Sequence, residues 1–338
     1  MPTLLLSDHD VRALLPMADC IEVMQDALRH LADGDAVLPL RTVLRLPDTP
    51  NAFATMPAIL GAGGTASLGA KVITIFPGND ATPFDSHIGV VLLFDAEFGT
   101  LLAIADASSI TAIRTAAVSG LATRLLARDD ASSVALLGAG VLALPHLEAM
   151  CAVRPIIRAQ IWSPSAAHAG SRAHELAERA RAALAIDVEV VTSAEAAVRE
   201  ADIVCTITAS RTPVLEGAWL RDGTHVNAVG ASLRTARELD SAAMRRAEFF
   251  ADRRESVLAE SGDFLIPREE GVIDDSHFRA ELGDLVRGTH AGRSSRASIT
   301  VFKSLGLAIE DVAALRHIHT RALVEGRGVP IELGGNRH

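Results

Sequence analysis

The residues with the clearest chemical potential form a glycine turn. The segment Gly138-Ala139-Gly140-Val141-Leu142-Ala143 follows the apolar run from Val134 to Leu137 and precedes a predicted helix. In such a turn the first glycine permits the tight bend, the second lets the backbone approach a pyrophosphate, and the small Ala143 lets helix pack on strand. The helix N-terminus offers free N–H groups to the phosphates. Another ligand would also suit such a turn, but its place at the head of a strand-helix series predicts a dinucleotide site.

Further contacts to a dinucleotide are expected at the ends of later strands. Ligands of open α/β sheets lie outside the carboxyl ends of the strands. Thr206 and Thr208 end one predicted strand, and Val229 ends another. Ordinary strand ends would give the same pattern, so these three residues are candidates by their position alone.

The second strand of the series bears on the choice of cofactor. It ends at Trp162, and no acidic residue follows before Glu175, whereas an acid at this point would hold the ribose 2′-hydroxyl of NAD. The residues that could receive a 2′-phosphate instead are Ser163, Ser165, His168 and Arg172. This pattern favours NADP(H) over NAD(H). The other interpretation is that these are ordinary residues at a helix N-terminus.

Three cations, Arg41, Lys71 and Arg114, are candidates for binding an anion. Lys71 lies within an otherwise apolar strand, from which it would point into a cleft with a shifted pKa. Arg114 lies where the character of the sequence changes, and its guanidinium fork suits a substrate carboxylate or a pyrophosphate. Most lysines and arginines are solvated surface residues, and the residue types alone do not exclude that interpretation.

The elements that must position these residues fall into two groups. Strands alternate with helices over residues 116–305, which predicts an α/β, Rossmann-type domain with a doubly wound parallel sheet. Residues 1–115 and 306–338 are predicted to form a second, discontinuous α+β domain with a mixed sheet. The principal predicted elements are a helix at 18–32, strands at 67–76, 88–95 and 100–106, and helices at 109–127, 142–152, 165–184 and 308–324.

The composition of the chain argues against nucleic-acid-binding, membrane-spanning and disulfide-bonded proteins. The chain of 338 residues carries a formal net charge of −10, which argues against nucleic acid as a partner because phosphate binding needs a basic face. No uncharged apolar run reaches the roughly 18 residues that a membrane span needs, so we expect no membrane association. Cys20, Cys151 and Cys205 are isolated in the sequence. We therefore expect neither disulfides nor a metal site, and a cytoplasmic location.

The order of short motifs along the chain resembles the ornithine cyclodeaminase/mu-crystallin family over about residues 36–325. The matching motifs lie in both predicted domains, which makes the resemblance specific. They are Pro39-Leu40-Arg41, Thr55-Met56-Pro57-Ala58, Gly69-Ala70-Lys71-Val72, Ser86-His87-Ile88-Gly89, Leu93-Phe94-Asp95, Thr111-Ala112-Ile113-Arg114-Thr115-Ala116-Ala117, the Gly138 turn, Asn227-Ala228-Val229-Gly230-Ala231, Arg237-Glu238-Leu239-Asp240, Ile299-Thr300-Val301-Phe302-Lys303-Ser304 and Glu310-Asp311.

The resemblance implies a homodimer joined through the domain outside the Rossmann fold, a cofactor of the NAD(H) or NADP(H) type, and a small amino or imino acid as substrate. In that pattern Arg41 and Arg114 look like clamps for a carboxylate or a pyrophosphate. Lys71 looks like the catalytic lysine beside the substrate, and Met56 would line the substrate pocket. The implied cofactor contacts, with Thr300 near the nicotinamide, are Arg114, Thr115, Gly138, Ala139, Gly140, Val141, Leu142, Ser163, Ser165, Thr206, Thr208, Val229 and Thr300.

Two departures from the family pattern indicate the subtype. The cyclodeaminases carry an acid where this chain has Ser232 and a glutamate where it has Ala54. The imine reductases that are similar to mu-crystallin share the serine, which can donate a hydrogen bond but is no general base unaided. The resemblance therefore implies NAD(P)H-dependent reduction of a cyclic ketimine carboxylate, such as Δ1-pyrroline-2-carboxylate or Δ1-piperideine-2-carboxylate, to proline or pipecolate.

We expect Lys71, Arg41 and Ser232 to form the catalytic set of such a reductase. Lys71 would supply or steady the proton at the imine nitrogen, alone or with a water held by Ser232, and Arg41 would hold the carboxylate. Two alternatives within the family are an ornithine cyclodeaminase and an amino-acid dehydrogenase. A third is a non-enzymatic, NADP-binding protein of the crystallin type.

Overall fold

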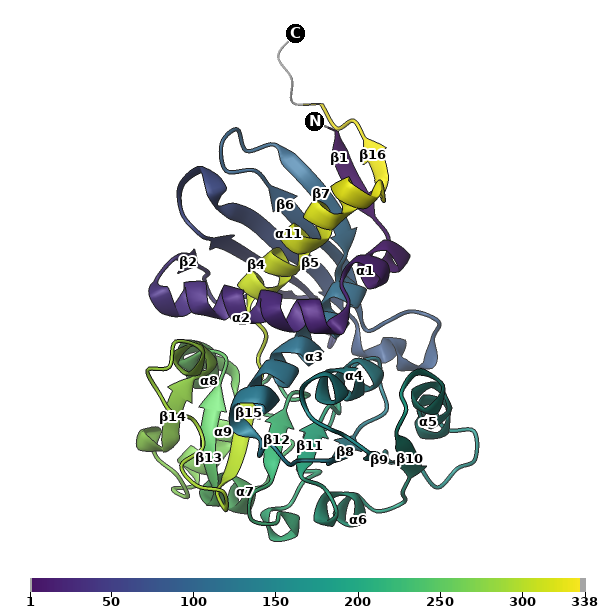
Figure 1. Cartoon of the computed structure of the whole chain (residues 1–338), viewed down its shortest axis with the longest axis vertical. Helices are drawn as coiled ribbons and strands as arrows, with labels where there is room; N and C mark the ends of the chain where they lie inside the picture. Colours follow the sequence, from purple (N-terminus) through teal and green to yellow (C-terminus); the bar gives the residue numbers. More distant parts are fainter. Residues whose placement is uncertain (1, 335–338) are drawn as a thin grey trace. The chain divides into compact units, whose positions relative to one another are not determined.

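The computed structural model describes residues 2–334, apart from the side chains of residues 80 and 81, and divides into two compact units (Figure 1). The first unit runs up to Arg114 and resumes at Gly306, so both ends of the chain contribute to it. The second unit runs from Thr115 to Leu305. The boundary between them falls within helix α3 (Ala107–Leu126).

The first unit is built on a mixed sheet of eight described strands in the order β16-β1-β7-β6-β5-β4-β2, with β3 also paired to β4. Among the described pairs, β1 and β7 are parallel and the others are antiparallel. The strands are β1 (Thr3–Leu6), β2 (Ala36–Val37), β3 (Thr42–Arg45), β4 (Ala52–Leu60), β5 (Ser67–Ile75), β6 (His87–Phe94), β7 (Leu101–Asp106) and β16 (Val329–Ile331).

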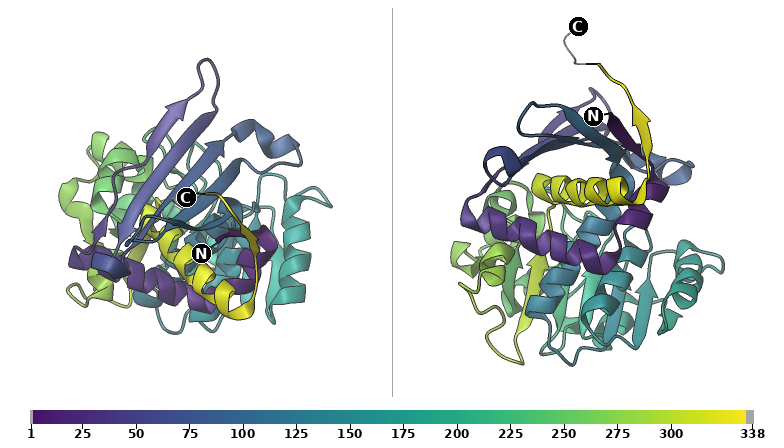
Figure 2. Two further views of the ribbon diagram at one scale, coloured as in Figure 1. Left: turned by 90° about the horizontal axis from the view of Figure 1, so that it is seen from above. Right: turned by 45° about the horizontal axis from the view of Figure 1, so that its top comes forward.

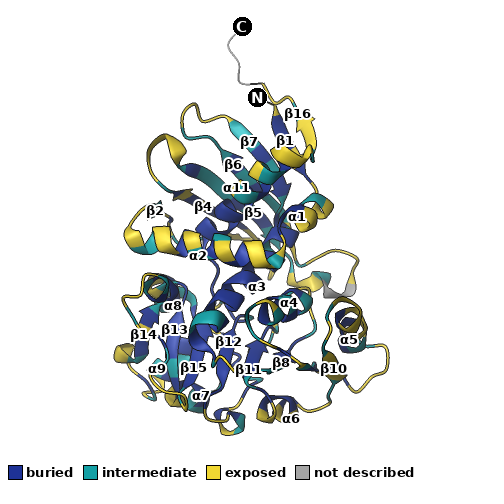
Figure 3. Cartoon of the chain, in the orientation of Figure 1, coloured by how far each residue is buried: buried dark blue, intermediate teal, exposed yellow. Residues whose placement is uncertain are grey.

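Helices of the first unit cover one face of this sheet (Figure 2). They are α1 (Asp8–Leu14), α2 (Met17–Asp33) and α11 (Ala308–Glu325); the short turns η1 (Gly63–Thr65) and η2 (Pro77–Ala81) lie in strand connections. Gly69 in β5 lets α11 approach closely, because a Cβ there would lie 2.8 Å from Cγ2 of Val312 and 2.5 Å from the carbonyl oxygen of Leu92. Alternate residues on the opposite face of the sheet are half-buried or exposed (Figure 3).

The second unit is a parallel sheet of eight described strands in the order β10-β9-β8-β11-β12-β15-β13-β14. The predicted Rossmann-type sheet is thus confirmed, and its central strands β8 and β11 are largely apolar and buried because helices cover both faces. The strands are β8 (Ser133–Leu137), β9 (Arg158–Trp162), β10 (Asp187–Val190), β11 (Ile203–Thr206), β12 (His225–Ala228), β13 (Ala247–Ala251), β14 (Phe278–Glu281) and β15 (Ile299–Lys303). The helices besides α3 are α4 (Ala143–Val153), α5 (Arg172–Ala183), α6 (Ala194–Arg199), α7 (Ser241–Arg246), α8 (Arg254–Glu260), α9 (Gly262–Glu269) and α10 (Leu282–Val286), with η3 (Gly217–Trp219) and η4 (Asp275–His277).

One local prediction differs from the structure. The helix predicted at 165–184 begins only at Arg172, because residues 163–171 form successive turns and Gly170 has a left-handed backbone with φ of 76°.

Pro57 lies inside β4, although proline cannot donate a hydrogen bond to a neighbouring strand. On one side β4 pairs with β3 through residues 52–55 and with β2 through residues 59–60, so Pro57 lies in the gap between these partners, where a missing N–H costs little.

Candidate active site

Lys71 is the centre of a buried ionic cluster in the first unit. It lies in the middle of β5, only 2% exposed, and its Nζ is 2.9 Å from Oδ2 of Asp311. The same Nζ lies 3.4 Å from Oγ1 of Thr111. Burial, together with the nearby Arg114 and Arg41, lowers the pKa of Lys71 to about 8, and the carboxylate of Asp311 opposes this shift. Lys71 is therefore a cation that can release its proton near neutral pH.

Arg114 shares the same carboxylates and is only 4% exposed. Its Nη1 donates to Oε2 of Glu310 at 2.6 Å, and its Nε donates to Oδ1 of Asp311 at 3.0 Å. Both acids are fully buried in the first turn of α11, where the helix dipole favours negative charge. This one helical turn thus supplies the counter-ions for both Lys71 and Arg114.

Arg41 reaches the cluster from the segment between β2 and β3, and its Nη2 donates to the carbonyl oxygen of Gly306 at 3.3 Å. Gly306 has a φ of 78°, and a Cβ there would lie 2.7 Å from Nη1 of Arg114. Glycine is therefore required at this position both for its left-handed backbone and for space. Arg41 is half-buried, unlike Lys71 and Arg114.

Lys71 and Arg114 pair with the two carboxylates, and Arg41 lies near Lys71 as a third cation. The formal charges of these five side chains sum to +1, which suits a ligand with a single carboxylate. Loss of hydration and the cations Lys71 and Arg41 lower the pKa of His87, at the start of β6. The predicted pocket residue Met56 is buried and lies directly opposite Lys71 in the β4–β5 pairing. The first unit thus brings together Arg41, Met56, Lys71 and Arg114.

The acidic members of the cluster, Glu310 and Asp311, had no predicted role. Glu310 and Asp311 stood out only as part of a family motif, and Thr111 only as a neighbour of Arg114. The usable signal was a pair of adjacent acids within the apolar first two turns of a predicted helix, because fully buried acids require buried cations as partners.

The glycine turn of the second unit leads from β8 into α4. Gly138 is buried with a φ of 122°, and a Cβ there would lie 2.7 Å from the carbonyl oxygen of Ile207. Gly140 is different, because no described residue places an atom within 4 Å of the position its Cβ would take. The fold itself therefore does not need glycine at 140, and the turn leaves open space beside the start of α4. A pyrophosphate fits such a space.

The other residues of the predicted cofactor set lie around the carboxyl edge of the sheet, with differing exposure. Val141 is 69% exposed, and Ala139 and Leu142 are half-buried. Thr115 in α3 and Val229 after β12 are almost fully buried. Ser163 and Ser165 follow β9 with their hydroxyl oxygens 3.4 Å apart, and Ser232 is half-buried in the segment after β12.

The predicted cofactor contacts of two threonines in that set, Thr206 and Thr208, need correction. Thr206 is fully buried, and its hydroxyl donates to Oε2 of Glu238 at 2.9 Å, so its side chain is not available to a ligand. Thr208 remains half-exposed, but its hydroxyl donates to Oε1 of the same carboxylate at 2.7 Å. Glu238, to which the sequence analysis gave no role of its own, therefore determines how both threonines are placed.

The prediction that Thr300 lies near the nicotinamide is wrong for this structure. Thr300 pairs with His225, the first residue of β12, and therefore lies at the amino edge of the parallel sheet. Its side chain is fully buried, with Oγ1 2.9 Å from Nδ1 of His225 and 3.1 Å from Nη2 of Arg293. Ligands of such sheets bind at the opposite, carboxyl edge, where β15 ends at Lys303.

Two kinds of site are not found in the described part of the chain. No group of three or more His, Cys, Asp or Glu side chains within residues 2–334 is placed to hold a metal ion. Over the same residues, none of the helices combines the length and apolar character that a membrane crossing requires.

A glycine turn between the first strand and first helix of an all-parallel sheet defines the second unit as a dinucleotide-binding fold. The chain belongs to the ornithine cyclodeaminase/mu-crystallin family, whose profile matches residues 1–326. It is 35% identical over 330 residues to Δ1-pyrroline-2-carboxylate reductase of Bacillus cereus, which covers 97% of this chain and 99% of the relative.

Two solved structures are similar over nearly the whole chain. One is Δ1-pyrroline-2-carboxylate reductase of Thermococcus litoralis in complex with NADH and L-proline, with a TM-score of 0.93, 39% identity, and coverage of 97% of this chain and 100% of that chain. The other is an archaeal alanine dehydrogenase dimer with bound NAD, with a TM-score of 0.90, 30% identity, and coverage of 99% and 100%. The resemblance predicted from sequence is confirmed.

The ionic cluster predicts a pH-dependent stability defect in the Asp311→Asn variant. Removing this carboxylate leaves Lys71 and Arg114 short of a buried counter-ion, which should lower the free energy of unfolding by about 3–5 kcal/mol at pH 7. The defect should shrink at pH 9, because Lys71, with its pKa near 8, is then mostly neutral and no longer needs Asp311. Urea unfolding at both pH values measures this difference.

The control for this experiment is Asp8→Asn, which breaks the exposed pair between Asp8 and Arg12 in the same unit. It should change the free energy of unfolding by less than about 1 kcal/mol at either pH. An equally small effect of Asp311→Asn would contradict the assignment of Asp311 as the counter-ion of the cluster.

Proposed function

We propose that this chain is an NAD(P)H-dependent reductase of cyclic ketimine carboxylates, converting Δ1-pyrroline-2-carboxylate or Δ1-piperideine-2-carboxylate to proline or pipecolate. The observation that carries the proposal is the buried Lys71, whose pKa lies near 8 in a cluster with a net positive charge. The similarity to Δ1-pyrroline-2-carboxylate reductases over nearly the full chain supports the same substrate class.

The first unit provides what an imino acid needs. Arg41 and Arg114 hold the carboxylate of the imino acid. The guanidinium of Arg114 also donates hydrogen bonds to Glu310 and Asp311. The protonated Lys71 donates to the imine nitrogen, which makes the C=N carbon a better hydride acceptor. Ser232, a residue of the second unit, is the proposed holder of a water for the same proton. Met56 forms an apolar wall beside Lys71. Proton transfer of this kind contributes about 10²–10⁴-fold to the rate.

The second unit provides the binding site for the cofactor. The open space at Gly140 and the start of α4 receive the pyrophosphate, and Ala139, Val141 and Leu142 complete the turn. The bound cofactor supplies the hydride that adds to the C=N carbon. Thr115 in α3, with Thr208 and Val229 at the strand ends, completes the proposed contacts within this unit. Arg114, the last residue of the first unit before the boundary, is a further proposed contact.

Two positions argue for reduction over cyclodeamination. Ala54 is buried in β4 opposite Ile73, which makes an apolar site where the cyclodeaminase pattern has a glutamate. Ser232 offers a hydroxyl where that pattern has an acid. With neither carboxylate present, these positions hold no general base for the substrate amine.

The direct test is reduction of the two imino acids by NADPH or NADH, with Lys71→Met as the key variant. Lys71→Met should lower kcat/KM at least 100-fold because the imine nitrogen loses its proton donor. In the wild type kcat/KM should fall as the pH rises through about 8, where Lys71 loses its proton. Asp311→Asn removes the carboxylate that raises this pKa, so the fall should move to lower pH. The absorbance of the reduced cofactor at each pH gives these rates.

The alternatives give different results in the same assays. Release of ammonia from L-ornithine without imine reduction would identify a cyclodeaminase, and NAD-dependent oxidation of an amino acid in preference to imine reduction would identify a dehydrogenase. Cofactor binding without turnover would indicate a binding protein. Full kcat/KM in Lys71→Met would exclude its role as proton donor. The titration of the imine itself is the same for both enzymes, so only the difference between wild type and Asp311→Asn reports on Lys71.

NADP(H) is the proposed cofactor because the loop after β9 offers hydroxyl and basic groups in place of an acid. Ser163, Ser165, His168 and Arg172 lie in or directly after the turns of residues 163–171. We expect a lower KM for NADPH than for NADH. Ser163→Asp should reverse this order, because a carboxylate repels the 2′-phosphate and accepts a hydrogen bond from the 2′-hydroxyl. A strong NADH preference in the wild type would refute the proposal.

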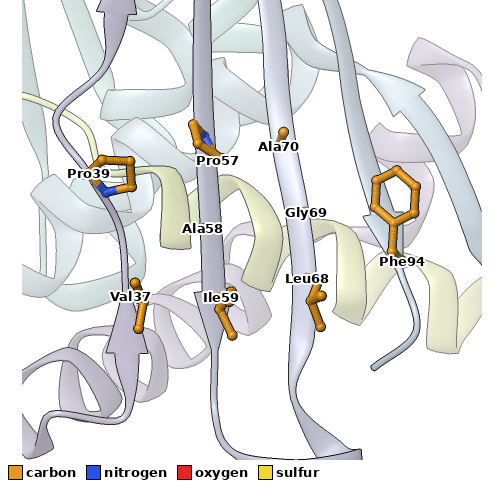
Figure 4. A pocket seen from close by; sticks show the side chains of 9 residues that line it. All are labelled: Val37, Pro39, Pro57, Ala58, Ile59, Leu68, Gly69, Ala70 and Phe94. Atoms are coloured by element: carbon orange, nitrogen blue, oxygen red, sulfur yellow. The ribbon is translucent and has the colours of Figure 1, made fainter. Parts of the chain in front are cut away.

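A homodimer through the exposed sheet face of the first unit is part of the proposal. This face carries a hollow of about 320 Å³, with apolar side chains pointing into it (Figure 4). It is lined by Val37, Pro39, Pro57, Ala58, Ile59, Leu68, Gly69, Ala70 and Phe94. Ile59 is 40% exposed, and a contiguous apolar patch of this kind is typical of an interface. The alanine dehydrogenase with the similar fold is itself a dimer.

Light scattering tests the dimer. The wild type should have about twice the 35.6 kDa mass of one chain, and Ile59→Glu should reduce it to a single chain because a charge would be buried in the interface. Val324→Glu is the matched control, since Val324 is also apolar and exposed but lies near the end of α11. A wild type that remains monomeric at micromolar concentration would contradict the proposal.

A further inference from the structure

Glu238 is a fully buried carboxylate that accepts four hydrogen bonds. Its Oε2 accepts from Oγ1 of Thr206 at 2.9 Å and from the backbone N–H of Gly230 at 2.7 Å. Its Oε1 accepts from the backbone N–H and from Oγ1 of Thr208, each at 2.7 Å. The two oxygens thus tie the end of β11 and the segment after it to the segment after β12, at the carboxyl edge of the sheet.

These segments are packed too closely for a side chain to lie between them. A Cβ at Gly230 would lie 2.0 Å from the carbonyl oxygen of Thr208 and 2.7 Å from Oε1 of Glu238. Ile207, beside Thr208, in turn contacts the glycine turn, because a Cβ at Gly138 would lie 2.7 Å from its carbonyl oxygen. The ends of three neighbouring strands, β8, β11 and β12, therefore form one continuous contact, and Glu238 holds it through polar bonds.

Glu238 is itself fixed by a second buried acid. Oδ1 of Asp263, near the start of α9, accepts from the backbone N–H groups of Glu238 and Leu239 at 2.8 and 3.0 Å. Oδ2 of Asp263 lies 3.0 Å from Nζ of Lys303, the last residue of β15, and both side chains are fully buried. Lys303, Asp263 and Glu238, all buried, thus form a chain of contacts that connects β15 to the segments after β11 and β12.

We propose that Glu238 is a positioning residue for the cofactor. Glu238 itself touches no ligand, but it holds Thr208 and Gly230 in place. Through Gly230 it also fixes segment 229–232, which carries Ser232 and forms the proposed binding site for the nicotinamide end of the cofactor. The inference rests on the proposed function, since it assumes that a nicotinamide cofactor occupies this edge. A carboxylate is required because all four partners donate, and a neutral amide cannot accept at both of its ends.

The test is cofactor affinity in Glu238→Gln, measured by isothermal titration with NADPH and NADH and without turnover. Either orientation of the amide turns its NH₂ group toward a backbone N–H, of Thr208 or of Gly230, so one segment loses its anchor. The Kd of the better cofactor should rise at least 10-fold. The KM for the imino acid at saturating cofactor should change less than about twofold.

The matched control is Asp202→Asn. Asp202 directly precedes β11 and therefore lies at the amino edge of the sheet, whereas Glu238 binds the carboxyl end of the same strand. Asp202 also accepts four hydrogen bonds, from the N–H groups of Ser132 and Ser133, the hydroxyl of Ser133, and Arg128. This variant should lower the unfolding temperature but leave the Kd of the cofactor unchanged. If both variants lose stability and neither changes the Kd, Glu238 is a structural residue only and the inference fails.

Thr206→Val keeps the inference testable if Glu238→Gln does not fold. Thr206 is fully buried and its hydroxyl bonds Glu238, so an effect on cofactor affinity must pass through that carboxylate. We expect a threefold or greater rise in Kd, and an unchanged Kd would overturn the inference. Failure of the wild type to bind either cofactor would instead overturn the proposed function, so the two failures are distinguishable.

Discussion

The first unit depends on the neutralisation of Lys71 and Arg114 by the first turn of α11. Bringing a lysine and an arginine out of water is costly unless each gains a close counter-ion and hydrogen bonds. Asp311 serves both cations, and Glu310 completes the partners of Arg114. The position of α11 on the sheet is thereby specified by charge as well as by apolar packing, and Gly69 and Gly306 supply the close approaches that this position needs.

The second unit uses the opposite arrangement at the edge of its sheet. In the first unit cations are held by acids that belong to the same cluster. At Glu238 an acid is held mainly by N–H and O–H donors, and burial raises its pKa while Lys303 lowers it. The cluster around Lys71 keeps a proton available near neutral pH. The hydrogen bonds of Glu238 instead hold the backbone of Thr208 and Gly230 in place.

Much of this arrangement could be predicted from local sequence. The alternation of strands and helices identified the parallel sheet, and the glycine turn, with its small Ala143, identified the start of α4. Lys71 was conspicuous because a lysine in an apolar strand must be explained. The partners of these residues could not be predicted, because Asp311 lies 240 positions from Lys71 and nothing local to either residue specifies the pairing.

Other failures have local physical causes. Thr300 was placed near the nicotinamide from a family motif, but its position at the start of β15 puts it at the amino edge. The start of α5 was missed because Gly170 takes a left-handed backbone that helical periodicity cannot show. The short strands β1 and β16 were also missed, since Thr3–Leu6 and Val329–Ile331 become strands only by pairing with each other and with β7.

The discontinuity of the first unit has a consequence for synthesis on the ribosome. The strand that carries Lys71 is made before the second unit, whereas the turn that carries Glu310 and Asp311 is made only after it. Until then β4, β5 and β6 lack their covering helix, and Lys71 and Arg114 lack their counter-ions. The second unit, being continuous, can fold while the chain is still growing. The first unit must wait until α11 has been made, so a chain terminated before α11 keeps the segments of the dinucleotide fold but cannot complete the cationic cluster.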